Sequence, residues 1–187
     1  MTVQLARKLY SVQEYYRMAE VDILTPDDKV ELIKGDVIFK SPVGKRHAFL
    51  VDQLNMLITT EIGRKVVVRI QNPITIGTHS EPEPDIVVAK LPREVYRDEH
   101  HPFPADIHFI IEVADSTLGY DKEIKLPLYA EAGILIFWIV NVNKEEIEVY
   151  EQPENGKYAR QTIYRRGDQL PIQAFDIILS VDDIFGS

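Results

Sequence analysis

A long apolar run that carries a single carboxylate constrains the fold of this chain more than any other feature. Residues 107–114 read Ile-His-Phe-Ile-Ile-Glu-Val-Ala, a pattern typical of a buried strand. Side chains alternate between the two faces of a strand, so an ionised Glu112 would point near or into the core. An unpaired buried carboxylate costs several kcal/mol, and such groups are normally paired or bound to metal. The run therefore predicts a buried sheet with a polar site built into it.

Segments around this run predict two more strands and a helix. Residues 84–89 read as a strand, and residues 134–140, the most apolar run of the chain, read as a central buried strand. Residues 118–132 predict a helix that contains Pro127. Because proline has no N–H and clashes with the preceding turn, we expect this helix to be kinked or shortened.

The other segments predict helices and short strands arranged around this centre. Ser11 and Glu14 form a capping box for a helix over residues 12–19, and Gly35 divides two apolar runs into a hairpin over residues 29–39. A further helix is predicted over 45–62, strands over 66–70, 74–76, 146–150 and 158–164, short β pieces over 170–179 and a turn over 181–185. Residues 90–105 predict a long loop with one helical turn near Glu94. One α/β domain over residues 1–187 follows from this order.

The amino-acid composition limits the classes of protein to which the chain can belong. At 45% hydrophobic and 27% charged residues the chain is typical of a soluble globular protein, and no apolar run reaches the length of a membrane span. The absence of cysteine excludes disulfides and thiolate metal sites. The first eight residues lack the apolar segment of a secretory signal, so we expect a cytoplasmic protein with no membrane partner.

The net charge of −9 argues against nucleic-acid binding, because nucleic-acid binders are usually basic. An acidic chain that binds phosphates must gather its positive charge locally or recruit cations. Four basic clusters are available for this: Lys45-Arg46-His47, Arg64-Lys65 with Arg69, Lys122 with Lys125, and Arg165-Arg166.

Two carboxylates on neighbouring strands suggest a metal site. Asp85 opens one strand and Glu112 lies near the end of the other. Mg²⁺ (or Mn²⁺) takes oxygen ligands, commonly one or two carboxylates with waters and phosphate oxygens, and the main-chain carbonyl of Val113 completes such a set. A bound ion would activate a water for phosphodiester hydrolysis.

The helix after Glu112 supplies groups that suit a phosphate. Lys122, Lys125 and Tyr129 follow at spacings of three and four, so they share roughly one face of the helix. Ser116 lies in the expected N-cap region, where backbone N–H groups also favour phosphate.

Each of these features also has a simpler interpretation. Glu112 pairs equally well with an arginine, and the two lysines alone are typical of a solvated helix face. Glu81, Glu83 and Asp85 could form a second metal cluster, but an exposed acidic lead-in is favoured.

The histidines are ambiguous in the same way. His47 is a candidate base or phosphate ligand, although by itself it is more typical of a structural or exposed residue. His100 and His101 lie in a proline-rich loop without evident partners, so a zinc site there is discounted.

Taken together, these segments resemble the Uma family of putative restriction endonucleases, a former domain-of-unknown-function family within the PD-(D/E)XK nuclease superfamily. The resemblance covers most of the chain. The matching segments are Val-Glu-Leu-Ile-Lys-Gly-Asp-Val at 30–37, His47, Glu-Pro-Asp-Ile-Val at 83–87, Ile-Glu-Val-Ala-Asp-Ser-Thr at 111–117, residues 121–133, and residues 138–150.

The resemblance implies a restriction-endonuclease-like core over about residues 29–150. This core is a mixed sheet flanked by helices, with an N-terminal helix and hairpin and C-terminal β additions. It implies Asp85 and Glu112 as metal ligands and Glu31 as a third acidic contributor. The superfamily often places its lysine two residues after the glutamate, where this chain has Ala114. The resemblance therefore points to Lys125 on the helix, with Lys122 as the alternative.

Three functions follow as hypotheses. The first is a Mg²⁺-dependent endonuclease acting on DNA, with duplex DNA as the expected partner and a homodimer matched to its two strands. The second is a non-catalytic module with this fold that binds protein or nucleic acid. The third is a phosphodiesterase directed at RNA or nucleotides. The sequence contains no base-reading element that would identify a recognition sequence.

Overall fold

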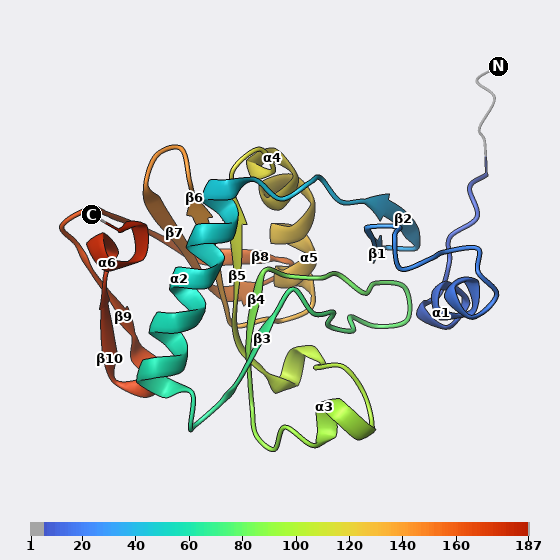
Figure 1. The fold of residues 1–187 in the computed structure, drawn as a ribbon, viewed down its shortest axis with the longest axis horizontal. Coiled ribbons are helices and arrows are strands. Elements are labelled where there is room, and N and C mark those ends of the chain that lie inside the picture. Colours follow the sequence, from blue (N-terminus) through green and yellow to red (C-terminus); the bar gives the residue numbers. More distant parts are fainter. Residues whose placement is uncertain (1–5, 187) are drawn as a thin grey trace.

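A six-stranded mixed sheet forms the centre of the protein in this computed structural model, which describes residues 6–186 (Figure 1). Its strands, in spatial order, are β3 (Val67–Ile70), β4 (Ile86–Ala89), β5 (Ile107–Ala114), β6 (Ile136–Asn141), β7 (Glu146–Glu154) and β8 (Lys157–Arg165). Strands β5 and β6 are parallel, and the other neighbours are antiparallel. Residues 1–5, part of the N-terminal stretch considered for a secretory signal, lie outside the described residues.

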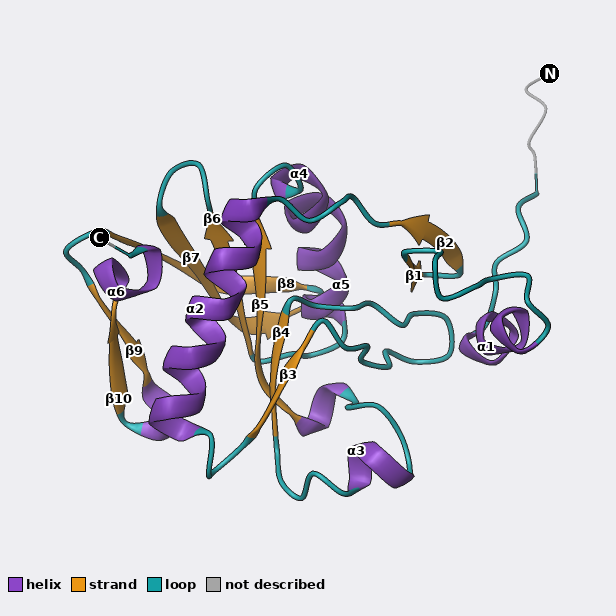
Figure 2. Ribbon diagram, viewed as in Figure 1, coloured by secondary structure: helices purple, strands orange, loops and turns teal. Residues whose placement is uncertain are grey.

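Helices and two small sheets surround this centre (Figure 2). The helical segments are α1 (Val12–Glu20), α2 (Lys45–Ile62), α3 (Val95–Asp98), η1 (Pro104–Asp106), α4 (Leu118–Tyr120), η2 (Asp121–Lys125), α5 (Leu126–Glu131), η3 (Gln173–Phe175) and α6 (Val181–Phe185). The small sheets pair β1 (Val30–Ile33) with β2 (Asp36–Phe39), and β9 (Gln169–Ile172) with β10 (Ile177–Ser180). The predicted mixed α/β architecture is confirmed, including the N-terminal helix and hairpin and the C-terminal β additions.

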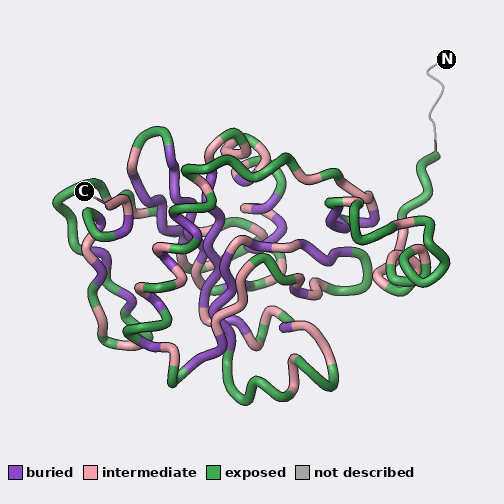
Figure 3. The backbone as a smooth tube through the Cα atoms, in the orientation of Figure 1, coloured by how far each residue is buried: buried purple, intermediate pink, exposed green. Residues whose placement is uncertain are grey.

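The sheet is covered on both faces, which explains why β5 is largely apolar. One face packs against α2 and α6, and Phe109 and Ile111 of β5 lie in that core. The other face packs against α5, and Ile110 of β5 lies in that second core together with Tyr129. Figure 3 shows the buried backbone concentrated along the central strands. Glu112, which alternates with Ile111, lies on the α5 face.

The segment from α4 to α5 is one crossover that joins the parallel strands β5 and β6, and it is interrupted as Pro127 predicts. The five residues of η2 form a wider π-type turn, in which the N–H of Leu126 donates to the carbonyl of Asp121 five residues earlier. Pro127 then falls in the first turn of α5, where its missing N–H removes no helical hydrogen bond.

Local sequence signals account for the ends of several elements. The capping box of Ser11 and Glu14 is formed, and α2 spans the predicted residues. The turn Asn155–Gly156 between β7 and β8 has both residues at positive φ, as the hairpin signal predicts. The strand expected over 74–76 is wrong, because only Ile76 bridges to Ser80 across a tight turn. Within residues 6–186, no helix has both the length and the apolar character of a membrane span.

Candidate active site

A cavity of about 720 Å³ opens where β4 begins and β5 ends. Its lining includes Glu112 from β5, Asp85 from the residue before β4, and Lys125 from η2. Strand register explains the meeting of the two acids. Because Ile86 pairs with Ile111 in an antiparallel ladder, the residue before one lies opposite the residue after the other. The hairpin β1–β2 and the start of α2 complete the walls.

Glu112 lies at the base of the cavity and is only 3% exposed. Its Oε1 accepts hydrogen bonds from Lys125 Nζ and from the Tyr129 hydroxyl, each at 2.9 Å. Its Oε2 accepts a longer one, 3.4 Å, from the backbone N–H of Asp85. Burial raises the pKa of this carboxyl to about 8, against the opposing attraction of the Lys125 ammonium.

Lys125 is the cation of this buried group. Its Nζ also lies 3.6 Å from Glu31 Oε2, so two carboxylates share one ammonium. Burial alone would lower the pKa of Lys125, but attraction to Glu112, Glu31 and Asp121 outweighs it and raises the pKa above its ordinary value. The side chain is therefore a permanent ammonium group inside the cavity.

Asp85 is held by three neighbours. Its Oδ2 accepts a hydrogen bond from the Val113 N–H at 2.8 Å and lies 2.9 Å from His47 Nε2, while Gln71 Nε2 approaches Oδ1 at 3.3 Å. Burial raises the pKa of Asp85, but contacts with His47, Val113 and Lys125 outweigh burial and leave the pKa below its ordinary value. The carboxylate form is therefore favoured. The contact between Asp85 and His47 also raises the pKa of the His47 imidazole.

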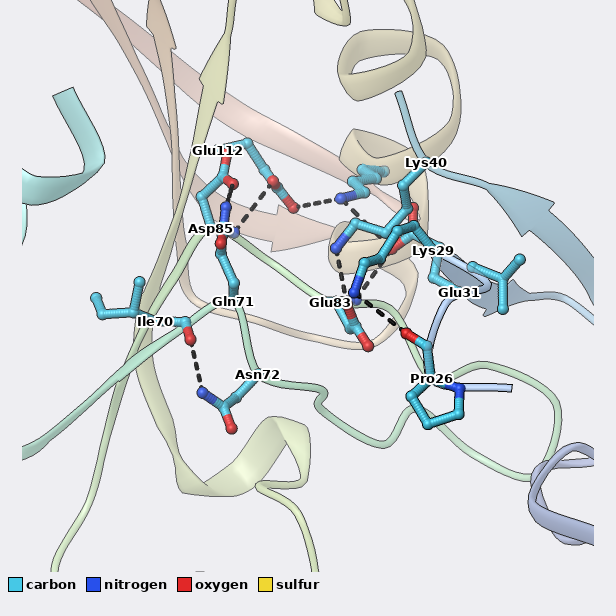
Figure 4. A network of polar contacts seen from close by, with 12 residues as sticks. Pro26, Lys29, Glu31, Lys40, Ile70, Gln71, Asn72, Glu83, Asp85 and Glu112 are labelled. Atoms are coloured by element: carbon cyan, nitrogen blue, oxygen red, sulfur yellow. Dashed lines mark hydrogen bonds and ion pairs between the residues drawn. The ribbon is translucent and has the colours of Figure 1, made fainter. Parts of the chain in front are cut away.

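Glu31 reaches the cavity from the hairpin strand β1 and is 2% exposed. Its Oε1 accepts from the Tyr120 hydroxyl at 3.0 Å, and its Oε2 accepts from the Glu83 N–H at 2.9 Å. Figure 4 shows Glu31, Glu83, Asp85 and Glu112 around this polar network, with Lys29 and Lys40 beside it. The hairpin thus adds a third acid to the two sheet carboxylates.

The sequence reasoning did not identify Asp121 as a site residue. Asp121 lines the cavity, is 3% exposed and accepts a hydrogen bond from Thr117 Oγ1 at 2.8 Å. Burial raises its pKa to about 6. The spacing of four between Asp121 and Lys125, which favours a side-chain pair on a helix, is the signal that could have pointed to it.

Of the two residues expected to share one helix face with Lys125, Tyr129 does so, because both side chains reach Glu112 Oε1, whereas Lys122 lies elsewhere. Lys122 pairs instead with the buried Glu148 of β7 at 2.7 Å, because the wide η2 turn rotates its side chain away from that of Lys125. Glu112 and Glu148 are both in register with Ile139, so the two acids are about two strand spacings, roughly 10 Å, apart. Tyr129 is fully buried behind Glu112, which differs from the substrate contact expected of it.

The remaining candidates also depart from their simpler interpretations. His47 is a cavity residue in contact with Asp85 and not a surface histidine. Ser116 lines the cavity as well. Glu81 is 2% exposed and accepts from the Tyr16 hydroxyl, so the expectation of an exposed acidic lead-in is wrong for this residue. The cause is long-range contact with α1, which local sequence does not reveal.

The oxygen atoms at the cavity base suit a hard cation that takes only two carboxylate ligands from the protein. Within residues 6–186, no group of three or more His, Cys, Asp or Glu side chains is arranged to hold a metal by itself. Asp85 and Glu112 adjoin each other, and the Val113 carbonyl points to the same strand edge as its N–H, which faces Asp85. Two carboxylates and a carbonyl, completed by waters, match the ligand preference of Mg²⁺.

Comparisons with known proteins agree with this fold. A crystal structure described as that of a putative nuclease belonging to DUF820 from Anabaena variabilis ATCC 29413 superposes with a TM-score of 0.72. The two chains are 18% identical over 94% of this chain and 97% of that one. No match was found among curated proteins. The family model Uma2, described as putative restriction endonuclease, matches residues 12–182. The chain therefore belongs to the Uma2 family of putative restriction endonucleases.

Proposed function

We propose that this chain is a divalent-metal-dependent endonuclease that hydrolyses phosphodiester bonds of DNA. The observation that carries the proposal is the meeting of Asp85, Glu112 and Lys125 in one cavity, although they come from three separate elements. Membership of the Uma2 family supports nuclease activity in general. The choice of Mg²⁺ or Mn²⁺ rests on the oxygen donors at the cavity base, and the choice of DNA on the family description.

The residues divide into ligands and positioning groups. Asp85, Glu112 and the carbonyl of Val113 would hold the metal ion. When bound, such an ion lowers the pKa of a coordinated water and offsets charge that develops on the phosphate. Lys125 fixes Glu112 and can donate a hydrogen bond to a phosphate oxygen or to the attacking water.

The surrounding groups have supporting roles in this proposal. Tyr129 positions Glu112 from behind, and His47 positions Asp85. Glu31 balances the charge of Lys125 from the hairpin side. Ser116, at the cavity wall, supplies a hydroxyl within the space that a phosphate would enter. Lys122 has no place in this mechanism because its ammonium is engaged by Glu148.

Cleavage assays on matched variants test the proposal. We expect the purified protein to cut DNA in the presence of Mg²⁺ or Mn²⁺. The Asp85→Asn variant should cut the same DNA at least about a hundredfold more slowly. The control is Glu148→Gln, which neutralises another buried carboxylate outside the cavity and should keep the activity. RNA of the same sequence, assayed in parallel, separates a DNase from an RNA-directed enzyme. Absence of cleavage with any divalent metal, or full activity in Asp85→Asn, would refute the proposal.

A second candidate is a binding module that keeps the fold without catalysis. It is favoured by the fact that Lys125, Tyr129 and His47 already satisfy the cavity carboxylates in the structure. Calorimetry with Mg²⁺ and Mn²⁺ decides between the two. Metal binding that disappears in Glu112→Gln supports the enzyme, whereas an absence of metal binding in the wild-type protein supports the module.

A further inference from the structure

We propose that the nucleotide next to the bond to be cut enters the cavity unpaired and stacks its base on Phe39. The inference rests on the proposed nuclease function and specifies its substrate class. That class is a single strand, or a duplex from which one nucleotide is displaced. The base of the cavity, with its acids and Lys125, would face the phosphate, and the hairpin rim would face the base.

Phe39 is an aromatic side chain without a packing role. It ends strand β2 opposite Val30, lines the cavity and is 76% exposed, whereas the preceding Ile38 turns inward and packs on the core. The next segment adds Pro42 and the exposed Val43 to the same rim. An apolar rim with a free aromatic ring is the surface on which unpaired bases stack, as in proteins that bind single strands or displaced nucleotides.

The dimensions of the site also favour one nucleotide over an intact double helix. At about 720 Å³, the cavity has the size of pockets that enclose small ligands. Glu112 and Lys125 are 3% and 5% exposed, so a phosphate must enter the cavity to reach them. In a duplex each phosphate is tied to paired and stacked bases, and displacing one nucleotide costs a few kcal/mol.

The distribution of positive charge also favours recognition of an unpaired base over recognition of the phosphate backbone. The chain carries 30 acidic and 21 basic side chains, and most of its arginines pair with carboxylates. Two lysines stand at the open end of the hairpin, joined by the hydrogen bond from the Lys40 N–H to the Lys29 carbonyl. Both line the cavity, and Lys40 is paired there with Glu83 at 2.8 Å (Figure 4). With so few cations for phosphates, affinity has to come largely from contacts to the base.

The experiment measures binding of fluorescein-labelled oligonucleotides by anisotropy in Ca²⁺, a hard cation that takes the same oxygen ligands. Three DNAs of one sequence are compared: a single strand, a duplex with a one-nucleotide gap, and an uninterrupted duplex. We expect the single strand and the gapped duplex to bind more tightly than the uninterrupted duplex. In Phe39→Ala the affinity for the first two should fall by about 5- to 150-fold, the range that loss of one stacked base produces.

Two further variants make the result specific. Phe39→Tyr keeps a ring and should bind like the wild type, and Ile178→Ala removes an exposed side chain of β10 outside the cavity lining and should change nothing. Equal affinity of all three DNAs, or unchanged binding in Phe39→Ala, overturns the inference. If the wild-type protein still cleaves DNA in either case, the nuclease proposal stands alone. If it neither binds nor cleaves any of the DNAs, both proposals fall.

Discussion

At the scale of single residues, the site depends on one ammonium group that serves two buried carboxylates. Lys125 contacts both Glu112 and Glu31, and all three side chains are nearly inaccessible to water. Removing one member of a buried ion pair leaves an uncompensated charge, which costs far more than the pair contributes when intact. Stability and catalysis are therefore linked at this position.

Lys125→Met should destabilise the protein by about 3–5 kcal/mol, because it leaves Glu112 buried without its cation. The double variant Lys125→Met/Glu112→Gln should recover part of that loss, since only Glu31 then lacks its cation, yet it should remain inactive. Urea unfolding measures the stabilities. The matched control is Lys34→Met, which breaks the exposed pair with Glu131 and should cost no more than about 1 kcal/mol. Equal losses in the two single variants would contradict this view.

Asp121 makes stability depend on pH in a defined window. Burial raises its pKa from the ordinary 3.8 to about 6, so the folded protein retains a proton that the unfolded chain releases. Its contribution is therefore complete below pH 3.8 and is lost as the pH rises to about 6. In Asp121→Asn this loss should disappear, which makes the variant more stable than the wild type at pH 7 by up to roughly 3 kcal/mol.

Urea unfolding of both proteins between pH 3.5 and 7, in roughly half-unit steps, tests this linkage. The difference between the two stabilities should grow through the window and then stay constant. A difference that is the same at every pH would show that Asp121 does not titrate there. Because Glu112 is present in both proteins, the effect of its raised pKa cancels in the comparison except for the part that the Asp121 charge contributes to it.

At the scale of elements, the hairpin β1–β2 depends on a glycine that also touches the N-terminal segment. Gly35 has a φ of +87°, and a Cβ at this position would meet Leu9 Cβ at 2.6 Å and backbone atoms of Leu9 and Tyr10 at 3.1 Å. The Tyr10 N–H donates to the Gly35 carbonyl, so the segment before α1 is held close to the turn. The turn therefore has to lack a side chain for two independent reasons.

Gly35→Ala should destabilise the protein by about 2–4 kcal/mol, from the unfavourable φ together with the steric clash. Gly167→Ala is the matched control, because Gly167 has a similar φ of +86° but open space around it, so only the smaller conformational cost of about 1 kcal/mol applies. Thermal or urea unfolding distinguishes the two. If the two variants lost the same amount of stability, Leu9 would have to move away from the added methyl group at no cost in free energy.

Local sequence explains most elements but not how side chains are shared between them. The capping box, the span of α2 and the Asn155–Gly156 turn follow from residues next to one another in the chain. Asp85 and Glu112 were identifiable because a carboxylate in an apolar strand requires a partner. Regular helix spacing did not predict that Lys122 pairs with Glu148, because η2 is a π-type turn. The burial of Glu81 depends on α1, more than sixty residues away in sequence.

At the scale of the whole molecule, the acidic charge sets how the protein responds to salt. Among the described residues, the lysines at the cavity mouth are Lys29 and Lys40, and Lys40 is already paired with Glu83 at 2.8 Å, so few counterions are released when a strand binds. The fold could be predicted from the sequence, because the apolar runs and the crossover helix define a mixed sheet. The rim of the cavity could not be predicted, because the positions of Phe39 and the two lysines depend on where the hairpin packs against the rest of the protein.

We therefore expect the affinity for single-stranded DNA to depend weakly on ionic strength, with a slope of log K against log salt between about −0.7 and −1.4 for one or two phosphate contacts. Lys29→Gln should lower this slope by about 0.7, and Lys157→Gln, on the distant strand β8, should leave it unchanged. Anisotropy titrations over a series of KCl concentrations give the slopes. A wild-type slope steeper than about −4 would indicate an extended phosphate-binding surface and contradict this prediction.

The hairpin β1–β2 forms a sheet of its own, joined to the rest of the protein by a bridge between Leu32 and Glu81, by backbone hydrogen bonds of Gly35 with His79 and Tyr10, and by a few side chains. In the proposed mechanism, the metal-binding acids Asp85 and Glu112 come from the edge of the large sheet, whereas the hairpin supplies Glu31 and, at the end of β2, the rim residues 39–43. If residues 39–43 contact the base as proposed, exchanging this short segment between family members should change substrate preference while Asp85 and Glu112 keep their places on the large sheet.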